Sequence, residues 1–258
     1  GFVASSWLLY FYLPPTGDPL IPIGLYGLAI FGGRLVSAVI TPYIGYLSDS
    51  SENRFGRRLP FMFVAAIIFL AAFALLWRPP LESKSVINWV YLLLVVIVFR
   101  LSTSLHQVPS QALLPELAED DNEYVKLSTW DATFLLIGMM WGGMAGIFIE
   151  RNGFQVMSFI YIISALVIFY APFLVLREKH IASNTSRISF RESLMLTLRN
   201  RNFIHFVVIW VLYLVAANFV QSSVPYIVTE VCLLNTAGTT YYFYIPGVIA
   251  SLLAYPLV

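Results

Sequence analysis

Long apolar runs alternate with short polar stretches along this chain, and that pattern sets the elements we expect. A short apolar run covers 1–13, and long runs cover 20–48, 59–77, 86–114, 124–149, 153–176, 202–229 and 238–258. Each long run approaches or exceeds the roughly 20 residues with which an α-helix crosses the hydrocarbon core of a bilayer. The pattern therefore predicts an all-α membrane protein with several spanning helices.

The lengths and order of the runs predict two groups of helices. The 1–13 run is too short to cross, and the chain opens and closes inside apolar runs. We therefore expect a fragment in which the first helix is truncated. Residues 1–176 are expected to form a six-helix bundle, and 202–258 the start of a second bundle. The polar 177–201 segment is expected to be the linker between them.

Composition and charge support a membrane protein and predict its orientation. The 258 residues are 59% hydrophobic and 11% charged, whereas a soluble domain has about 25% charged residues. The loops between the runs form two alternating sets. The set 49–58, 115–126 and 177–201 contains ten lysines and arginines, and the set 14–19, 78–85 and 150–152 contains three. Because basic loops stay in the cytoplasm, we expect a multi-pass protein of the plasma (inner) membrane with 49–58 and 177–201 cytoplasmic.

The sequence offers little for catalysis, metals or nucleic acid. There is one cysteine, Cys232, and the three histidines lack metal-ligand spacing. Basic residues flank the spans and form no groove with interleaved aromatics, which argues against nucleic-acid binding. We therefore expect no enzyme activity, no cofactor and no metal site. The expected partners are a small-molecule substrate and the lipid bilayer, with protons as candidate coupling ions.

Polar residues inside the apolar runs are the main functional candidates. Arg34 and Arg100 each lie 14 residues from the cytoplasmic end of their run, about 21 Å along a helix axis. Helical spacing extends these positions into two polar stripes, formed by Arg34, Ser37 and Thr41 and by Arg100, Thr103, Ser104, Gln107 and Gln111. A substrate cavity and a hydrogen-bonded seam between helices both fit, and two mid-membrane arginines favour the cavity.

A smaller polar face occupies the 202–229 run. Asn218, Gln221 and Ser222 form it. The same two interpretations apply to these residues: they contribute to the cavity from the second bundle, or they tie helices together.

Two residues are candidates for proton coupling. Asp131 lies seven residues into its run, on nearly the face that carries Gly138, Gly142 and Gly146. Because such glycine-spaced faces pack closely on other helices, we expect Asp131 to point into the bundle. His106 lies at a comparable depth but about 120° from the polar stripe of its own run, and a structural role fits it better.

The polar stretch "GYLSDSSENRFGRRLP" at 45–60 resembles the loop signature of the major facilitator superfamily. The matching residues are Gly45, Asp49, Arg54, Gly56, Arg57 and Arg58. The resemblance implies a conformational latch, in which these charges hold two bundles in one state and release them in the other. An ordinary solvated loop with cytoplasmic arginines is the alternative.

Other stretches narrow the resemblance. "GRLVSAVITPYIGYLSD" (33–49), "VPSQALLPEL" (108–117) and "RNGFQ" (151–155) are similar to the glycoside–pentoside–hexuronide:cation symporters, the melibiose-permease-like branch. This implies a twelve-helix transporter whose halves rock around a midplane site. The branch places cation-binding carboxylates where this chain has Ser37, Thr41 and Gln107. Because neutral oxygens make a poor sodium site, we expect no sodium coupling.

These observations predict a secondary active or facilitative transporter of a small polar solute, working by alternating access. The resemblance implies a sugar or a sugar acid, and two arginines fit the acid better because guanidinium groups pair with carboxylates. Two alternatives stay open: a transporter of a lipid-like substrate, and a non-transporting scaffold or sensor on the same fold.

Overall fold

The computed structural model describes residues 1–51, 56–118, 120–175, 195, 199–247 and 249, and these contain helices and no strands. The helices are α1 (Phe2–Tyr12), α2 (Ile23–Ser50), α3 (Leu59–Leu76), α4 (Val86–Leu117), α5 (Asp121–Gly143), α6 (Ala145–Val175) and α8 (Arg201–Tyr226). Two π-helical turns follow, η1 (Ile227–Val231) and η2 (Thr239–Tyr244). The predicted all-α fold is confirmed.

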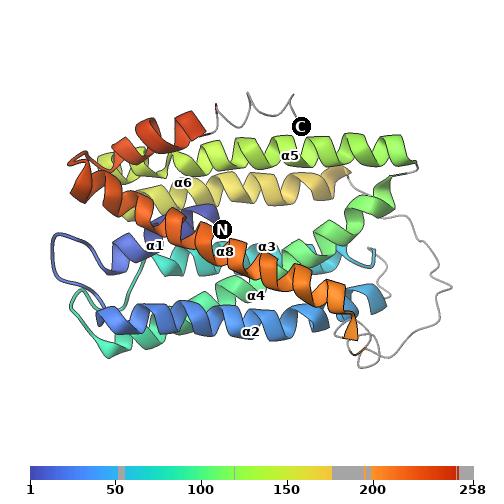
Figure 1. Cartoon of the computed structure of the whole chain (residues 1–258), viewed down its shortest axis with the longest axis horizontal. Helices are drawn as coiled ribbons and strands as arrows, with labels where there is room; N and C mark the ends of the chain where they lie inside the picture. Colours follow the sequence, from blue (N-terminus) through green and yellow to red (C-terminus); the bar gives the residue numbers. More distant parts are fainter. Residues whose placement is uncertain (52–55, 119, 176–194, 196–198, 248, 250–258) are drawn as a thin grey trace.

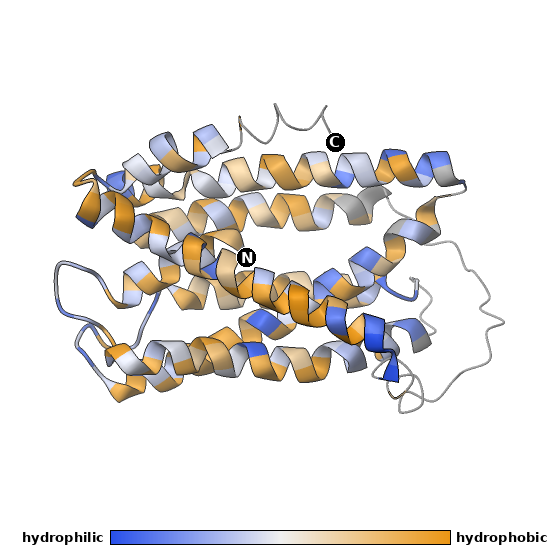
Figure 2. Ribbon diagram, in the orientation of Figure 1, coloured by the Kyte–Doolittle hydropathy of each residue, from blue (hydrophilic) through white to orange (hydrophobic). Residues whose placement is uncertain are grey.

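The helices run along the long axis of the molecule, and their connections gather at its two ends (Figure 1). We call the end that carries residues 13–22, 77–85 and 232–238 the outer end. The opposite end, near 56–58 and 118–120, is the inner end. Hydrophobic residues dominate the helices, and hydrophilic residues concentrate at the inner end (Figure 2). This distribution suits a bundle surrounded by lipid.

Five of the described helical segments are long and apolar enough to cross a membrane: Ile23–Asp49, Leu59–Leu76, Val86–Leu113, Ala145–Ala171 and Arg201–Val231. Each overlaps a span that the sequence predicts. The predicted 124–149 span corresponds mainly to α5, which is less apolar, because four of the eleven residues 121–131 are charged. The predicted linker, 177–201, lies largely outside the described residues, as does the end of the 238–258 run.

The chain reverses direction within α6, at Gly153. Met144 separates α5 from α6, and α6 itself consists of two helical segments that meet at Gly153, where φ is +78°. Glycine tolerates this backbone conformation because it has no Cβ. Across the hairpin, the Tyr161 hydroxyl donates to the carbonyl of Trp141 at 2.6 Å. The bend therefore adjoins the loop that the sequence predicts at 150–152.

The packed core lies where α1, α3, α4 and α6 meet. Trp7, Tyr12 and Leu76 are fully buried in it, and Trp77 is 1% exposed. The Tyr12 hydroxyl donates to the carbonyl of Leu76 at 3.1 Å, and the Trp77 ring stacks on Phe154 with centroids 5.4 Å apart. The Tyr12 hydroxyl thus ties the end of α1 to the end of α3, and the helix on which α1 packs most extensively is α8.

Asn88, at the start of α4, ties the loops of the outer end together. Its side chain is fully buried and donates to the carbonyls of Leu20, Leu81 and Ser83 at 2.9–3.0 Å. It also accepts a hydrogen bond from the Leu81 amide at 3.1 Å. One side chain therefore satisfies backbone groups from two loops.

Candidate substrate-binding cavity

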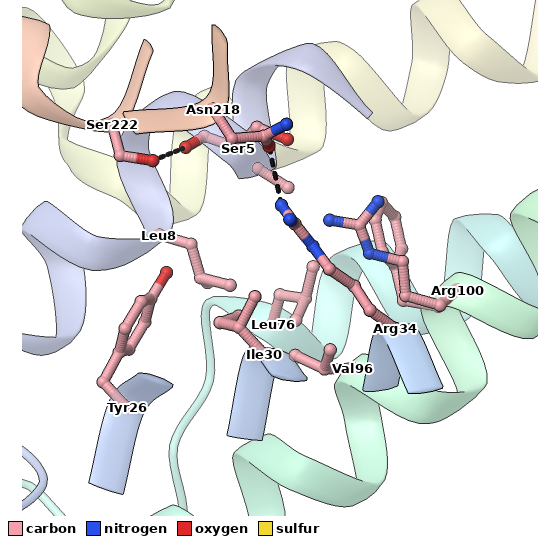
Figure 3. A pocket seen from close by; sticks show the side chains of 12 residues that line it. Ser5, Leu8, Tyr26, Ile30, Arg34, Leu76, Val96, Arg100, Asn218 and Ser222 are labelled. Atoms are coloured by element: carbon pink, nitrogen blue, oxygen red, sulfur yellow. Dashed lines mark hydrogen bonds between the residues drawn. The ribbon is translucent and has the colours of Figure 1, made fainter. Parts of the chain in front are cut away.

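A cavity of about 60 Å³ lies between α1, α2, α4 and α8 (Figure 3). Its walls also include one residue of α3, and the lining residues are Ala4, Ser5, Leu8, Tyr26, Ile30, Arg34, Leu76, Val96, Phe99, Arg100, Asn218 and Ser222. Half of the lining residues are apolar and half carry polar side chains, which come from α1, α2, α4 and α8. The cavity is smaller than the roughly 300–1,000 Å³ of sites that hold drug-sized ligands, so a sugar-sized solute requires it to widen.

Arg34 and Asn218 meet across this cavity, although 184 positions separate them in the chain. The Arg34 Nη2 donates to the Asn218 Oδ1 at 2.6 Å, and the Asn218 amide donates to the carbonyl of Leu214 in its own helix. The sequence suggested a polar role for both residues without pairing them. The structure brings them together, so that α2 and α8 are joined through the wall of the cavity.

Arg100 contributes a second guanidinium group from α4. Its side chain points to the same region as that of Arg34 (Figure 3), and its Nε is buried without a hydrogen-bond partner among the described residues. No acidic residue lines the cavity. A buried charge without a partner is costly, so the site is suited to a solute that offers an anionic group or several hydroxyl oxygens.

Sequence reasoning missed two polar lining residues, Tyr26 and Ser5. The Tyr26 side chain reaches the cavity from α2 (Figure 3). It lies eight positions before Arg34, close to the same helix face, so an extension of the predicted stripe would have found it. The Ser5 carbonyl accepts a hydrogen bond from the Ser222 hydroxyl at 3.1 Å, a contact between α1 and α8 that no periodicity could have indicated.

Ser37 and Thr41 form a hydroxyl cluster with Ser104 instead of lining the described cavity. The hydroxyls of Ser37 and Ser104 lie 2.8 Å apart, and Thr41 Oγ1 donates toward Ser104 Oγ at 3.0 Å and the Ser37 carbonyl at 2.6 Å. These contacts join α2 to α4. Of the two interpretations that the sequence allowed, the hydrogen-bonded seam therefore fits these residues better than the cavity. The cluster consists of three neutral hydroxyls, without a carboxylate.

Two other predicted binding residues are also absent from the cavity wall. Thr103 donates its hydroxyl to the carbonyl of Phe99 in its own helix at 2.7 Å, and Gln107 is exposed. The predicted stripe follows α4 past the end of the cavity, which explains why its later members lie elsewhere.

Asp131 and His106 have different surroundings. Asp131 is exposed among the described residues, and a Cβ at Gly138 would meet nothing within 4 Å, so the described part of the chain does not pack there and the burial of Asp131 stays a prediction. Close packing begins one turn later, at Gly142. The His106 ring lies 4.6 Å from that of Phe169 in α6, a contact that fits a structural role.

The predicted latch residues lie at the inner end. Arg58, which is 5% exposed, donates to Asp49 Oδ1 from Nε at 3.1 Å and from Nη2 at 2.7 Å. This pair joins the end of α2 to the start of α3 and does not span two bundles. Gly56 has a φ of +109°, which accounts for glycine there. Arg57 lies beside it in the sequence, and Arg54 is outside the described residues.

Comparison with known proteins identifies the family. The sequence matches the MFS/sugar transport protein family over residues 1–258. It is 31% identical over 137 residues to an uncharacterized symporter of Synechocystis, covering 51% of this chain and 25% of the relative. It is 24% identical over 213 residues to the isoprimeverose transporter of Lactiplantibacillus pentosus, covering 77% of this chain and 43% of the relative. Human major facilitator superfamily domain-containing protein 12 is 25% identical over 141 residues, covering 52% and 29%.

The chain belongs to the MFS/sugar transport protein family. The predicted resemblance to the glycoside–pentoside–hexuronide:cation symporters is therefore confirmed, as is a fragment of the major facilitator fold. The chain is an integral, multi-pass membrane protein of a transporter family. It matches only 25% to 43% of the length of the relatives named above.

Proposed function

We propose that the full-length protein carries a small polar solute across the membrane by alternating access, with the solute bound between α1, α2, α4 and α8 when the cavity there widens from about 60 Å³. The hydrogen bond between Arg34 and Asn218 carries this proposal. It places polar groups from both predicted helix groups in one cavity, which is the arrangement that a rocking transporter needs. The 1–176 and 202–258 groups would then move relative to each other. The inner end would lie on the cytoplasmic side of a plasma membrane.

The solute is a sugar or a sugar acid. The family description and the isoprimeverose transporter support a sugar-sized solute. Hydroxyl groups of such a solute can accept hydrogen bonds from Arg34 and Asn218 and bond to the hydroxyl of Tyr26. A carboxylate would add charge-assisted bonds to Arg100, whose Nε is buried without a partner among the described residues. We therefore expect an acid to bind more tightly than its neutral counterpart.

Transport is proposed to be independent of sodium. Ser37, Thr41 and Ser104 are neutral and bond to one another, so they offer a sodium ion no carboxylate, and neutral oxygens alone make a poorer site. Asp131 and His106 are the candidates for proton coupling. Asp131 is exposed among the described residues, and His106 is the weaker candidate.

Uptake into proteoliposomes that contain the full-length protein tests this proposal. Labelled D-glucuronate and D-glucose are offered under a sodium gradient, a proton gradient or neither. We expect saturable uptake of at least one solute, insensitive to sodium, with preference for the acid. Arg100→Gln should remove that preference by weakening binding of the acid about 10-fold to 100-fold, the value of a hydrogen bond to a charged group. Arg78→Gln, in an exposed loop, is the matched control and should behave as wild type.

The outcomes separate the parts of the proposal. Sodium-driven accumulation would contradict the coupling argument alone. Equal uptake of both solutes, unchanged in Arg100→Gln, would contradict the preference for an acid. Absence of saturable uptake of either solute would contradict transport of a sugar-like solute.

A further inference from the structure

Glu150 joins the two groups of helices at the outer end. Its Oε1 accepts a hydrogen bond from the Asn235 side-chain amide at 2.7 Å, and its Oε2 accepts one from the backbone amide of Ala237 at 2.8 Å. Both carboxylate oxygens of one residue are thus bound by the segment that follows α8. The predicted function used neither Glu150 nor this segment.

Two glycines near Glu150, Gly143 and Gly146, allow the two groups to approach closely. A Cβ on Gly143 would lie 2.7 Å from Tyr244 Cβ, whereas the neighbouring Gly142 packs on Phe2 of its own group. A Cβ on Gly146 would collide with the carbonyl oxygen of Thr236 and the hydroxyl of Thr239. A methyl group at Gly146 is therefore incompatible with the observed packing, because one of the colliding atoms belongs to the backbone.

Further hydrogen bonds fasten the same surfaces. Thr240 donates to the carbonyl of Gly143 at 2.6 Å, and Thr236 donates to that of Gly146 at 3.4 Å. Thr240 and its neighbour Thr239 are fully buried. The contact is therefore a closely packed interface. We call the hydrogen bonds of Glu150 with Asn235 and Ala237, at the edge of this interface, the clasp.

The clasp lies on the outer side of the candidate cavity. Along α8, Asn218 and Ser222 line the cavity, and the chain then continues toward the outer end through Tyr226. The Tyr226 hydroxyl donates to the Leu13 carbonyl at 2.7 Å, and its ring lies 5.3 Å from that of Tyr10. These contacts hold α1 and α8 together between the cavity and the outer end.

We propose that Glu150 and the close contact at Gly143 and Gly146 form the outer gate of the transporter: the gate is closed in this structure and opens once per transport cycle. The inference rests on the proposed function. Glu150 and Asn235 are exposed, so their hydrogen bond exchanges readily with water and can break reversibly. The contact at Gly143 and Gly146 supplies the close fit that defines the closed state.

Distance measurements on the full-length protein in nanodiscs test the gate without requiring transport. Spin labels are placed on Cys232, which is exposed beside the clasp, and on Arg151→Cys, next to Glu150; other cysteines are replaced by serine. We expect a short-distance closed population and a longer open one. Gly146→Ala should reduce the ratio of closed to open at least 10-fold, and Glu150→Ala about threefold to 10-fold, because two hydrogen bonds at an exposed site are lost.

Gly138→Ala is the matched control, because a Cβ there meets nothing within 4 Å, and it should leave the ratio unchanged. Equal distance distributions in wild type, Gly146→Ala and Gly138→Ala would overturn the gate, as would a single distance in all three.

A disulfide between Glu150→Cys and Asn235→Cys tests whether gate opening is required for transport. Oxidation should abolish solute uptake, and reduction should restore it, while each single variant is insensitive to oxidant. Uptake that survives quantitative crosslinking would overturn the gate while leaving the proposed function intact. Absence of uptake in the reduced wild type would instead contradict the proposed function, and the distance measurements would still decide whether the gate moves.

Discussion

Ser104→Ala distinguishes a structural seam from a binding site most cleanly. The variant removes one hydroxyl from α4 and with it the contacts to Ser37 at 2.8 Å and to Thr41 at 3.0 Å. Hydrogen bonds between helices in membranes contribute about 0.6 kcal/mol each. Thr41 keeps its bond to the carbonyl of Ser37. The expected loss is therefore about 1.2 kcal/mol of the free energy of unfolding.

Thermal unfolding and solute binding are measured on the same full-length preparation. For a domain of this size, a loss of about 1 kcal/mol lowers the unfolding temperature by about 2–4 °C. The affinity for the transported solute should stay within about twofold of wild type, because the cluster lies outside the described cavity wall. Ser102→Ala is a suitable control: Ser102 is buried two residues before Ser104, and its hydroxyl donates to the carbonyl of Phe99 in its own helix.

The refuting result is a specific one. A loss of affinity of about 10-fold or more in Ser104→Ala, with an unfolding temperature equal to that of Ser102→Ala, would place the hydroxyl cluster in the binding site. The distinction between seam and cavity drawn above would then be wrong.

Three further predictions concern other contacts. Asn88→Ala should lower the free energy of unfolding by about 2–4 kcal/mol, because four hydrogen bonds to backbone are lost; an unchanged denaturant midpoint would contradict this. Arg58→Gln should lower the free energy of unfolding by about 1 kcal/mol, since its partner Asp49 is exposed. It should leave the closed-to-open ratio of the outer gate unchanged in distance measurements, and a large change would instead support a latch between the bundles. Asp131→Asn should abolish proton-driven uptake while binding persists, and proton-driven accumulation in that variant would remove Asp131 from coupling.

The helical fold could be predicted because the bilayer imposes it. A run such as 59–77 has to be helical to satisfy its backbone in lipid, and α3 spans Leu59–Leu76. The cost of polar groups in a membrane likewise singles out Arg34, Arg100 and Asn218, all of which line the cavity. In these cases one physical constraint determines the answer.

The remaining features depend on neighbours that sequence periodicity does not identify. Spacing placed Ser37 on a polar face but could not show that Ser104 would satisfy it. The expected burial of Asp131 assumed that the glycine face packs along its whole length, whereas packing begins at Gly142. Glu150 carries no periodic signal, because a loop-end carboxylate resembles any other solvated residue until its partners are known.

Solute counterflow tests the central claim most directly. Proteoliposomes containing the full-length protein are loaded with unlabelled solute and diluted into a trace of labelled solute, so that exchange through an alternating site gives transient accumulation without any ion gradient. We predict counterflow in wild type and its loss in Arg34→Ala, which removes the guanidinium that meets Asn218, while the control Arg78→Gln exchanges normally. Counterflow at the wild-type rate in Arg34→Ala would contradict the account, because the solute would then bypass the cavity between the two helix groups.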